Sequence, residues 1–211
     1  MNQVFPFLLN TPYGSPPDVE PDIAESAEFT SPSEYTVTLK PGLKWANGHD
    51  LTSSDVKFSF DRQVAIAAEN GPSSLLYNLD SVEAVDPPTT VVFHLKSDND
   101  QVFPQILSSP PVGPIVDEEV FAADAITPPD DDIVKGNAFA GQYVITSYDF
   151  NNLVTYEAYD GYQASSRRQD PPRGQREVLR RRVQPQARHP AGQHRRRVAQ
   201  PDGHRHRRPA R

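Results

Sequence analysis

The chain has 211 residues and a net charge of −7, which is the balance of two segments of opposite sign. Residues 1–163 carry five Lys and one Arg against 25 acidic residues, whereas residues 164–211 carry 15 Arg against three acidic residues. The chain has no Cys, which excludes disulfides and thiolate metal sites, and no run of the ~20 apolar residues that span a bilayer.

The second segment differs from the first in more than charge. All Phe, Tyr and Trp residues precede position 164, and the large aliphatic residues beyond it are Val178, Leu179, Val183 and Val198. So few apolar side chains cannot offset the entropy of ordering a backbone, roughly 1–2 kcal/mol per residue. The composition therefore predicts that residues 164–211 are disordered.

The first segment begins with a predicted loop and a strand. Residues 10–32 are rich in Pro, Asp, Glu and Ser, which favours a loop. Residues 35–40 alternate apolar and polar side chains, which predicts a half-buried strand. A turn at residues 41–42 and a short strand at residues 43–45 follow, before a second turn at Asn47 and Gly48.

Residues 52–55 resemble a capping box, in which Thr52 and Asp55 each bond to the backbone amide of the other. The helix that follows is predicted to bury Val56, Phe60, Val64 and Ala67 and to end at residues 70–71. Short strands are predicted at residues 81–85 and 90–95. Short helices are predicted at residues 99–108 and 117–123, and Pro104 is expected near the first turn of the former. Residues 143–148 and 153–159 are predicted to form a hairpin that turns at residues 151–152.

No catalytic or metal site is predicted from the residue pattern. Trp45 is interpreted as a packing residue rather than a ligand-stacking one, because it lies on a short strand. His49 and His94 have no partner at metal-ligand spacing, and the acidic run at residues 130–132 is interpreted as a solvated loop. We expect neither an enzyme nor a cofactor.

Residues 24–62 resemble the signature of family 5 extracellular solute-binding proteins. The match comprises Ala24–Ser26, Tyr35–Lys40, Gly42–Trp45, Asn47–Gly48, Leu51–Thr52, Asp55–Val56, Phe58–Ser59 and Arg62. Residues 81–86 and 90–95 resemble the next strand pair of the family, and residues 141–143 read Gly-Gln-Tyr where the family usually has Gly-Pro-Tyr. The signature residues expected to be structural are Gly42, Lys44, Trp45, Gly48, Thr52, Asp55, Val56 and Arg62.

The resemblance implies an α/β (α+β) fold in which residues 1–163 are part of a class II periplasmic-binding-protein-like fold, including the β-rich subdomain of its first lobe. It implies the substrate-binding component of an ABC transporter, with a peptide or similar small solute as ligand and a membrane permease as partner. Ser73, Ser74 and Tyr77 are expected to contact the ligand, because related proteins approach ligand from this subdomain. Such proteins work outside the cytoplasm, but the start of this chain lacks the pattern of a signal peptide, so this chain is expected to stay in the cytoplasm. With one lobe missing, it is also expected to be inactive.

Two interpretations of the arginine-rich segment remain open. Its Lys-free composition is typical of GC-rich DNA translated in a shifted frame. When synonymous codons are chosen for residues 177–205 and translated one nucleotide later, they can give a sequence that resembles the family. Alternatively, the 15 Arg could bind nucleic acid in a salt-dependent way, although no aromatic residue is present to stack on bases. No nucleic-acid partner is expected. For residues 1–163, a separate possibility is that they form a stand-alone β-rich binding module.

Overall fold

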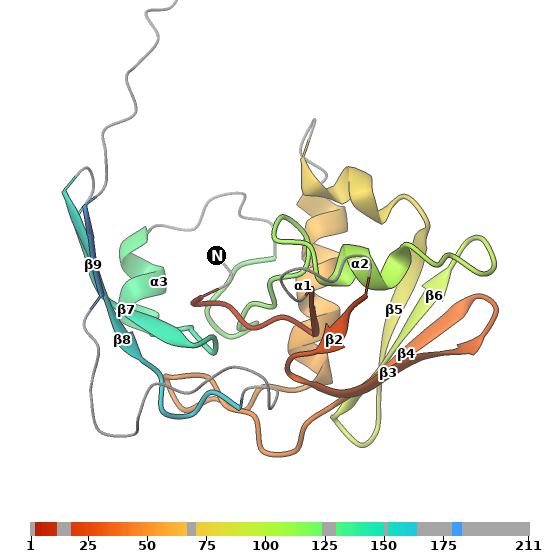
Figure 1. Ribbon diagram of the computed structural model, residues 1–211, viewed down its shortest axis with the longest axis horizontal. Helices are drawn as coiled ribbons and strands as arrows, with labels where there is room; N and C mark the ends of the chain where they lie inside the picture. Colours follow the sequence, from red (N-terminus) through yellow and green to blue (C-terminus); the bar gives the residue numbers. More distant parts are fainter. Residues whose placement is uncertain are drawn as a thin grey trace, which may run out of the picture.

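The structure is a computed structural model that describes residues 3–11, 18–66, 71–123, 130–149, 152–163 and 179–182. Its larger sheet is antiparallel, with strand order β3-β4-β6-β5 (Figure 1). These strands are β3 (Ala24–Ser31), β4 (Glu34–Leu39), β5 (Leu79–Val85) and β6 (Thr90–Leu95). The strands predicted from alternation at 35–40, 81–85 and 90–95 are confirmed.

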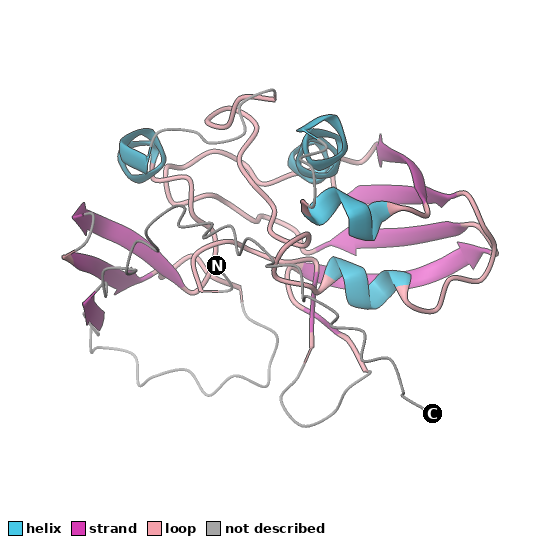
Figure 2. Cartoon of the chain, turned by 90° about the horizontal axis from the view of Figure 1, so that it is seen from above, coloured by secondary structure: helices cyan, strands magenta, loops and turns pink. Residues whose placement is uncertain are grey.

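Two helices, α1 (Ser53–Ile66) and α2 (Phe103–Leu107), pack beside this sheet (Figure 2). Every second residue of β4 and β6 is buried, so one face of the sheet forms the core. The ring of Phe93 on β6 lies 5.1 Å from that of Phe60 on α1 and 5.5 Å from that of Phe103 on α2. Both helices therefore cover the same face of the sheet, and their aromatic side chains meet at Phe93.

The predicted start of α1 is confirmed in part. The Asp55 carboxylate accepts a hydrogen bond from the Thr52 amide at 2.8 Å, but the Thr52 hydroxyl accepts from the Ser54 amide rather than from Asp55. Val56 and Phe60 are buried as predicted, whereas Val64 is 50% exposed. The prediction for Val64 is wrong because each step of four residues turns about 40° around a helix, so Val64 lies about 80° from Val56. Ala67 and Asn70 lie outside the described residues.

A second, smaller sheet has the strand order β7-β8-β9. The predicted hairpin is confirmed as β7 (Tyr143–Asp149) and β8 (Leu153–Ala158), and helix α3 (Asp130–Gly136) contacts β7. Strand β9 (Leu179–Arg182) pairs with β8 and belongs to the segment predicted to be disordered. That prediction does not hold for these four residues, and the rest of residues 164–211 lies outside the described part of the chain.

The N-terminal segment joins parts of the fold that are far apart in sequence. The Ile115 amide donates to the Pro6 carbonyl, and the amides of Gly141 and Tyr143 donate to the carbonyls of Val4 and Gln3. Strand β1 (Leu9–Asn10) then pairs with β2 (Glu20–Pro21), which leads directly into β3. Residues 3–10 therefore connect the segment that follows α2, the start of β7 and the larger sheet.

Three sequence-based predictions are corrected by the structure. Residues 10–32 are not all loop, because β2 and the eight-residue β3 lie within them. Residues 117–123 form a single turn, in which the amides of Val120 and Phe121 both donate to the Asp117 carbonyl, and the turn does not continue into a helix. The helix predicted at 99–108 is only α2, with Pro104 in its first turn as expected.

The short strand predicted at 43–45 is a single bridge between Lys44 and Asp50, closed by the turn at Asn47 and Gly48. Gly48 has a φ of +98°, which favours glycine at this position. None of the helices in the described ranges is long and apolar enough to cross a membrane.

Candidate ligand-binding site

The three residues expected to contact ligand lie together at one end of α1. The 3-10 helix η1 (Pro72–Leu76) carries Ser73 and Ser74, and Tyr77 follows it directly. Tyr77 is 68% exposed, Ser74 is exposed and Ser73 is half-buried. The structure therefore groups the three residues, and it presents an aromatic ring and a hydroxyl group to solvent.

Two buried neighbours hold Tyr77 in this exposed position. Leu76 is 4% exposed within the hydrophobic core, and Asn78 is 5% exposed. The Asn78 side-chain amide donates to an Asp100 carboxylate oxygen at 2.8 Å, and its carbonyl oxygen accepts from the Ser97 amide at 2.9 Å. Because both flanking side chains are fixed, the backbone of Tyr77 is fixed and its ring faces outward.

Residues 96–100 form hydrogen bonds to the backbone around Tyr77 and to the turn between β3 and β4. The Lys96 ammonium group donates to the Tyr77 carbonyl at 3.3 Å, and the Lys96 amide donates to the Asn78 carbonyl at 2.9 Å. The Asn99 amide donates to the Pro32 carbonyl in the turn between β3 and β4. The position of Tyr77 is thus set by the larger sheet through a chain of hydrogen bonds.

Leu75, which was not among the residues expected to contact ligand, is 39% exposed and adjoins Ser74 on the same short helix. A large apolar side chain exposed beside an exposed Tyr provides the kind of contact that small-molecule sites use. The signal in the sequence was the apolar pair Leu75–Leu76, of which the structure buries only the second residue.

Three of the signature residues make packing or polar contacts in the structure. Trp45 is 1% exposed and belongs to the core, and Lys44 forms an exposed ion pair with Asp50. Arg62 donates from Nε to the Ala122 carbonyl at 2.8 Å and lies 5.8 Å from the centre of the Phe121 ring. Partial burial lowers the pKa of the Arg62 guanidinium below its usual value. These contacts hold the turn after residue 117 against α1.

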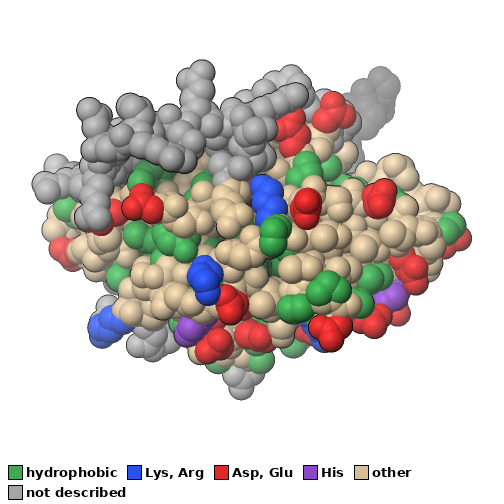
Figure 3. Space-filling view, turned by 90° about the horizontal axis from the view of Figure 1, so that it is seen from below, with side chains coloured by type: hydrophobic (Ala, Val, Ile, Leu, Met, Phe, Trp, Pro, Cys, Tyr) green, Lys and Arg blue, Asp and Glu red, His purple; other side chains and the backbone are tan. Residues whose placement is uncertain are grey.

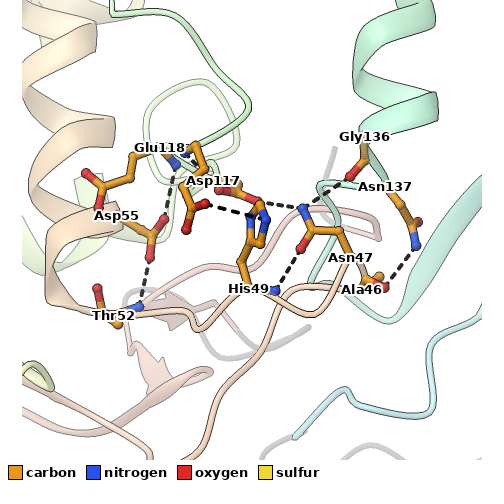
Figure 4. A network of polar contacts seen from close by, with 10 residues as sticks. Ala46, Asn47, His49, Thr52, Asp55, Asp117, Glu118, Gly136 and Asn137 are labelled. Carbon is orange, nitrogen blue, oxygen red and sulfur yellow. Dashed lines mark hydrogen bonds and ion pairs between the residues drawn. The ribbon is translucent and has the colours of Figure 1, made fainter.

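A polar network near the start of α1 joins four parts of the chain (Figure 4). The Asp117 carboxylate, almost fully buried, accepts from His49 Nδ1 at 2.9 Å and from Asn47 Nδ2 at 2.8 Å. The Asp55 carboxylate accepts from the amides of Thr52 and Glu118. Desolvation by burial raises the pKa of Asp55 to about 6. His49 is therefore not isolated, because its partners are supplied by a segment 68 residues away.

The described residues offer two further surface features. A shallow cavity of about 290 Å³ lies on the outer side of α1 and is lined by Ser54, Lys57, Phe58, Asp61, Arg62, Ala65, Glu118 and Ala123. Acidic side chains gather along one edge of the face shown in Figure 3, among few basic ones. Within the described ranges, no group of three or more His, Asp or Glu side chains is arranged to hold a metal ion.

The sequence model described as "Bacterial extracellular solute-binding proteins, family 5 Middle" matches residues 18–180. No curated protein sequence matches the chain.

Several solved structures share its fold. An ABC transporter substrate-binding protein from Sinorhizobium meliloti aligns with 22% identity and a TM-score of 0.66, over 89% of this chain and 35% of its own. MoaA from A. tumefaciens R10, in complex with mannopinic acid, aligns with 26% identity and a TM-score of 0.62, over 76% of this chain and 32% of the MoaA chain. The oligopeptide-binding protein AppA from Bacillus subtilis, in complex with a nonapeptide, aligns with 22% identity and a TM-score of 0.60, over 76% of this chain and 31% of the AppA chain. The chain thus spans about a third of the length of these proteins.

Proposed function

Because the chain belongs to family 5 of the bacterial extracellular solute-binding proteins, we propose that it is part of the substrate-binding component of an ABC transporter for peptides or similar small solutes. The observation that carries this proposal is the family match over residues 18–180, which extends over most of the chain. Its activity is binding rather than chemical conversion. The partners are a small solute and a membrane permease, and the working location is outside the cytoplasm.

Within this function, Ser73, Ser74 and Tyr77 contribute to the surface that contacts the solute. An exposed Tyr held between two buried residues can pack against an extended ligand at low entropic cost, because its backbone is already fixed. The Tyr77 hydroxyl can donate a hydrogen bond to a ligand carbonyl group, whereas the Ser74 hydroxyl donates to the Gly71 carbonyl at 3.0 Å and can accept a bond from the ligand. The adjacent Leu75 adds apolar surface.

The ligand class is open within this family. The B. subtilis protein was solved with a nonapeptide and the A. tumefaciens protein with mannopinic acid, so membership alone does not choose between peptides and other polar solutes. The site around Tyr77 favours a ligand with carbonyl groups and some apolar surface, a description that peptides fit. We also retain the proposal that residues 164–211 are translated from a shifted frame, which resequencing the DNA around codons 160–180 would test.

Native mass spectrometry of the full chain with a mixture of tri- to hexapeptides tests the proposed function. We expect peptide adducts that Tyr77→Ala weakens about tenfold, and Tyr148→Ala, which changes a Tyr on β7 far from η1 in sequence, serves as the control. Absence of any peptide adduct, or equal weakening by both variants, would overturn the proposed site. Adducts with RNA that disappear with increasing salt would support nucleic-acid binding instead.

A further inference from the structure

Two turns that are distant in sequence meet at the buried carboxylate of Asp117. One Asp117 oxygen accepts hydrogen bonds from His49 Nδ1 at 2.9 Å and Asn47 Nδ2 at 2.8 Å, and the other accepts from the Glu119 amide at 3.0 Å (Figure 4). The Asp117 side chain is 1% exposed, and that of His49 is 35% exposed. We call the set Asn47, His49, Asp55 and Asp117 the clasp.

The clasp connects the turn before α1 to the end of α3 as well as to the turn at residues 117–119. Asn47 Nδ2 also donates to the Gly136 carbonyl at 3.1 Å, and Asn137 Nδ2 donates to the Ala46 carbonyl at 3.0 Å. At the start of α1, Asp55 accepts from the Glu118 amide at 3.1 Å. Loss of the clasp would therefore release several segments from one another at once.

Most of the charged groups around His49 are acidic. Asp117 and Glu119 face it from the 117–119 turn, with Glu119 Oε2 at 3.5 Å from His49 Nε2, and Asp55 faces it from α1. Glu118 is exposed on the same turn, and Asp50, on the same turn as His49, is paired with Lys44. At the end of α3, Lys135 is the basic residue of the last turn. A proton taken up by His49 therefore adds a positive charge beside several carboxylates.

We propose that mild acid strengthens the clasp, so that the segments it joins are held more firmly near pH 5.5 than near pH 8. His49 contacts one buried and one exposed carboxylate, and a second buried carboxylate, that of Asp55, lies in the same network. Protonation of His49 completes an ion pair with Asp117. Protonation of Asp55 weakens its bonds from the Thr52 and Glu118 amides, but it removes a buried negative charge, and this desolvation effect is the larger of the two.

The direction of the pH dependence follows from proton linkage. The hydrogen bond with Asp117 raises the pKa of His49 above its usual 6.5, so its contribution is complete below about pH 6.5 and is lost as the pH rises through the folded-state pKa. Burial raises the pKa of Asp55 from 3.8 to about 6, so this group also favours the folded state at lower pH. From Asp55 alone, the unfolding equilibrium constant rises about fourfold between pH 5.5 and pH 8.

Urea unfolding of the full chain at pH 5.5, 6.5, 7.5 and 8 and constant ionic strength, followed by circular dichroism, tests the proposal. We expect the urea midpoint to fall as the pH rises, and His49→Gln to reduce this slope because glutamine keeps a donor to Asp117 but takes up no proton. His94→Gln is the comparison variant, because it removes a histidine that lies outside the clasp, on the larger sheet between Glu34 and Glu83.

A wild-type midpoint that rises with pH, or equal slopes in His49→Gln and the wild type, would overturn the proposal. If His49→Gln does not fold, NMR titration of the histidine rings in the wild-type chain decides the question. A His49 pKa above 6.5 supports the clasp, and a value at or below 6.5 contradicts it.

Discussion

Replacing Trp45 by Phe tests whether the N–H group of the only indole in the chain destabilises the hydrophobic core. Trp45 is 1% exposed, and its Nε1 atom has no hydrogen-bond partner among the described residues. A buried donor without a partner costs about 1–3 kcal/mol, because the group has lost its water and gained nothing in exchange. Phenylalanine removes that donor and keeps a ring.

The gain is offset by lost volume. The smaller ring leaves roughly 40 Å³ unfilled, which costs about 1 kcal/mol at about 24 cal/mol per Å³, and the lost apolar contacts cost about 1 kcal/mol more. The two effects have opposite sign and similar size. We therefore expect the free energy of unfolding to change by less than about 1 kcal/mol.

Urea unfolding followed by far-ultraviolet circular dichroism measures this change, since the variant has no tryptophan fluorescence. Phe60→Leu is the control, because Phe60 is equally buried, carries no polar atom and should lose about 1–2 kcal/mol with nothing to offset it. A loss of about 3 kcal/mol or more in Trp45→Phe would show that the indole N–H has a partner, and the reasoning would be refuted.

Two further substitutions and one titration have expected outcomes. Gly141→Ala should lose about 1–3 kcal/mol in thermal unfolding, because the new Cβ lies 2.6 Å from the Val4 carbonyl carbon and 2.7 Å from the Gln3 oxygen; wild-type stability would contradict this packing. Tyr162→Phe should lose about 1.5–3 kcal/mol, because the Tyr162 hydroxyl donates to the buried Asp22 carboxylate at 2.6 Å; a loss below 0.5 kcal/mol would argue against this bond. The Asp55 carboxyl should titrate near pH 6 in a ¹³C NMR experiment, and a value near 3.8 would show that burial does not control it.

The parts of the fold that were predicted are those in which local pattern and burial agree. Strands β4 and β6 alternate strictly between buried and partly exposed residues, and the sequence shows the same alternation. Strand β3 was missed because it is an edge strand with only one partner: its polar residues Glu25, Ser26 and Glu28 are exposed, and only Ala27 and Phe29 interrupt them. Its apolar alternation is limited to these two half-buried residues, too short a pattern to stand out from the acidic and Ser-rich residues around it.

The contacts of the clasp were beyond prediction for a different reason. His49 and Asp117 are 68 residues apart, and nothing near either residue indicates the other. The segment 117–123 was predicted to be a helix, but only one turn forms, with the amides of Val120 and Phe121 on the Asp117 carbonyl. The expected ligand contacts of Ser73, Ser74 and Tyr77 stay a prediction; the three residues lie within five positions of one another, on η1 and directly after it.

The backbone pairing of the first residues affects how the chain can fold during synthesis. Gln3 and Val4 bind the amides of Tyr143 and Gly141, so this part of the molecule cannot close until about 140 more residues have been made. At about 5–20 residues per second, a nascent chain waits roughly seven to thirty seconds. During the first part of that interval, Phe7, Leu8 and Leu9, all buried in the finished protein, lack the core residues Leu107 and Ile115 and the bridge to Pro114. The early chain is therefore a candidate client for chaperones that shield apolar segments on the ribosome.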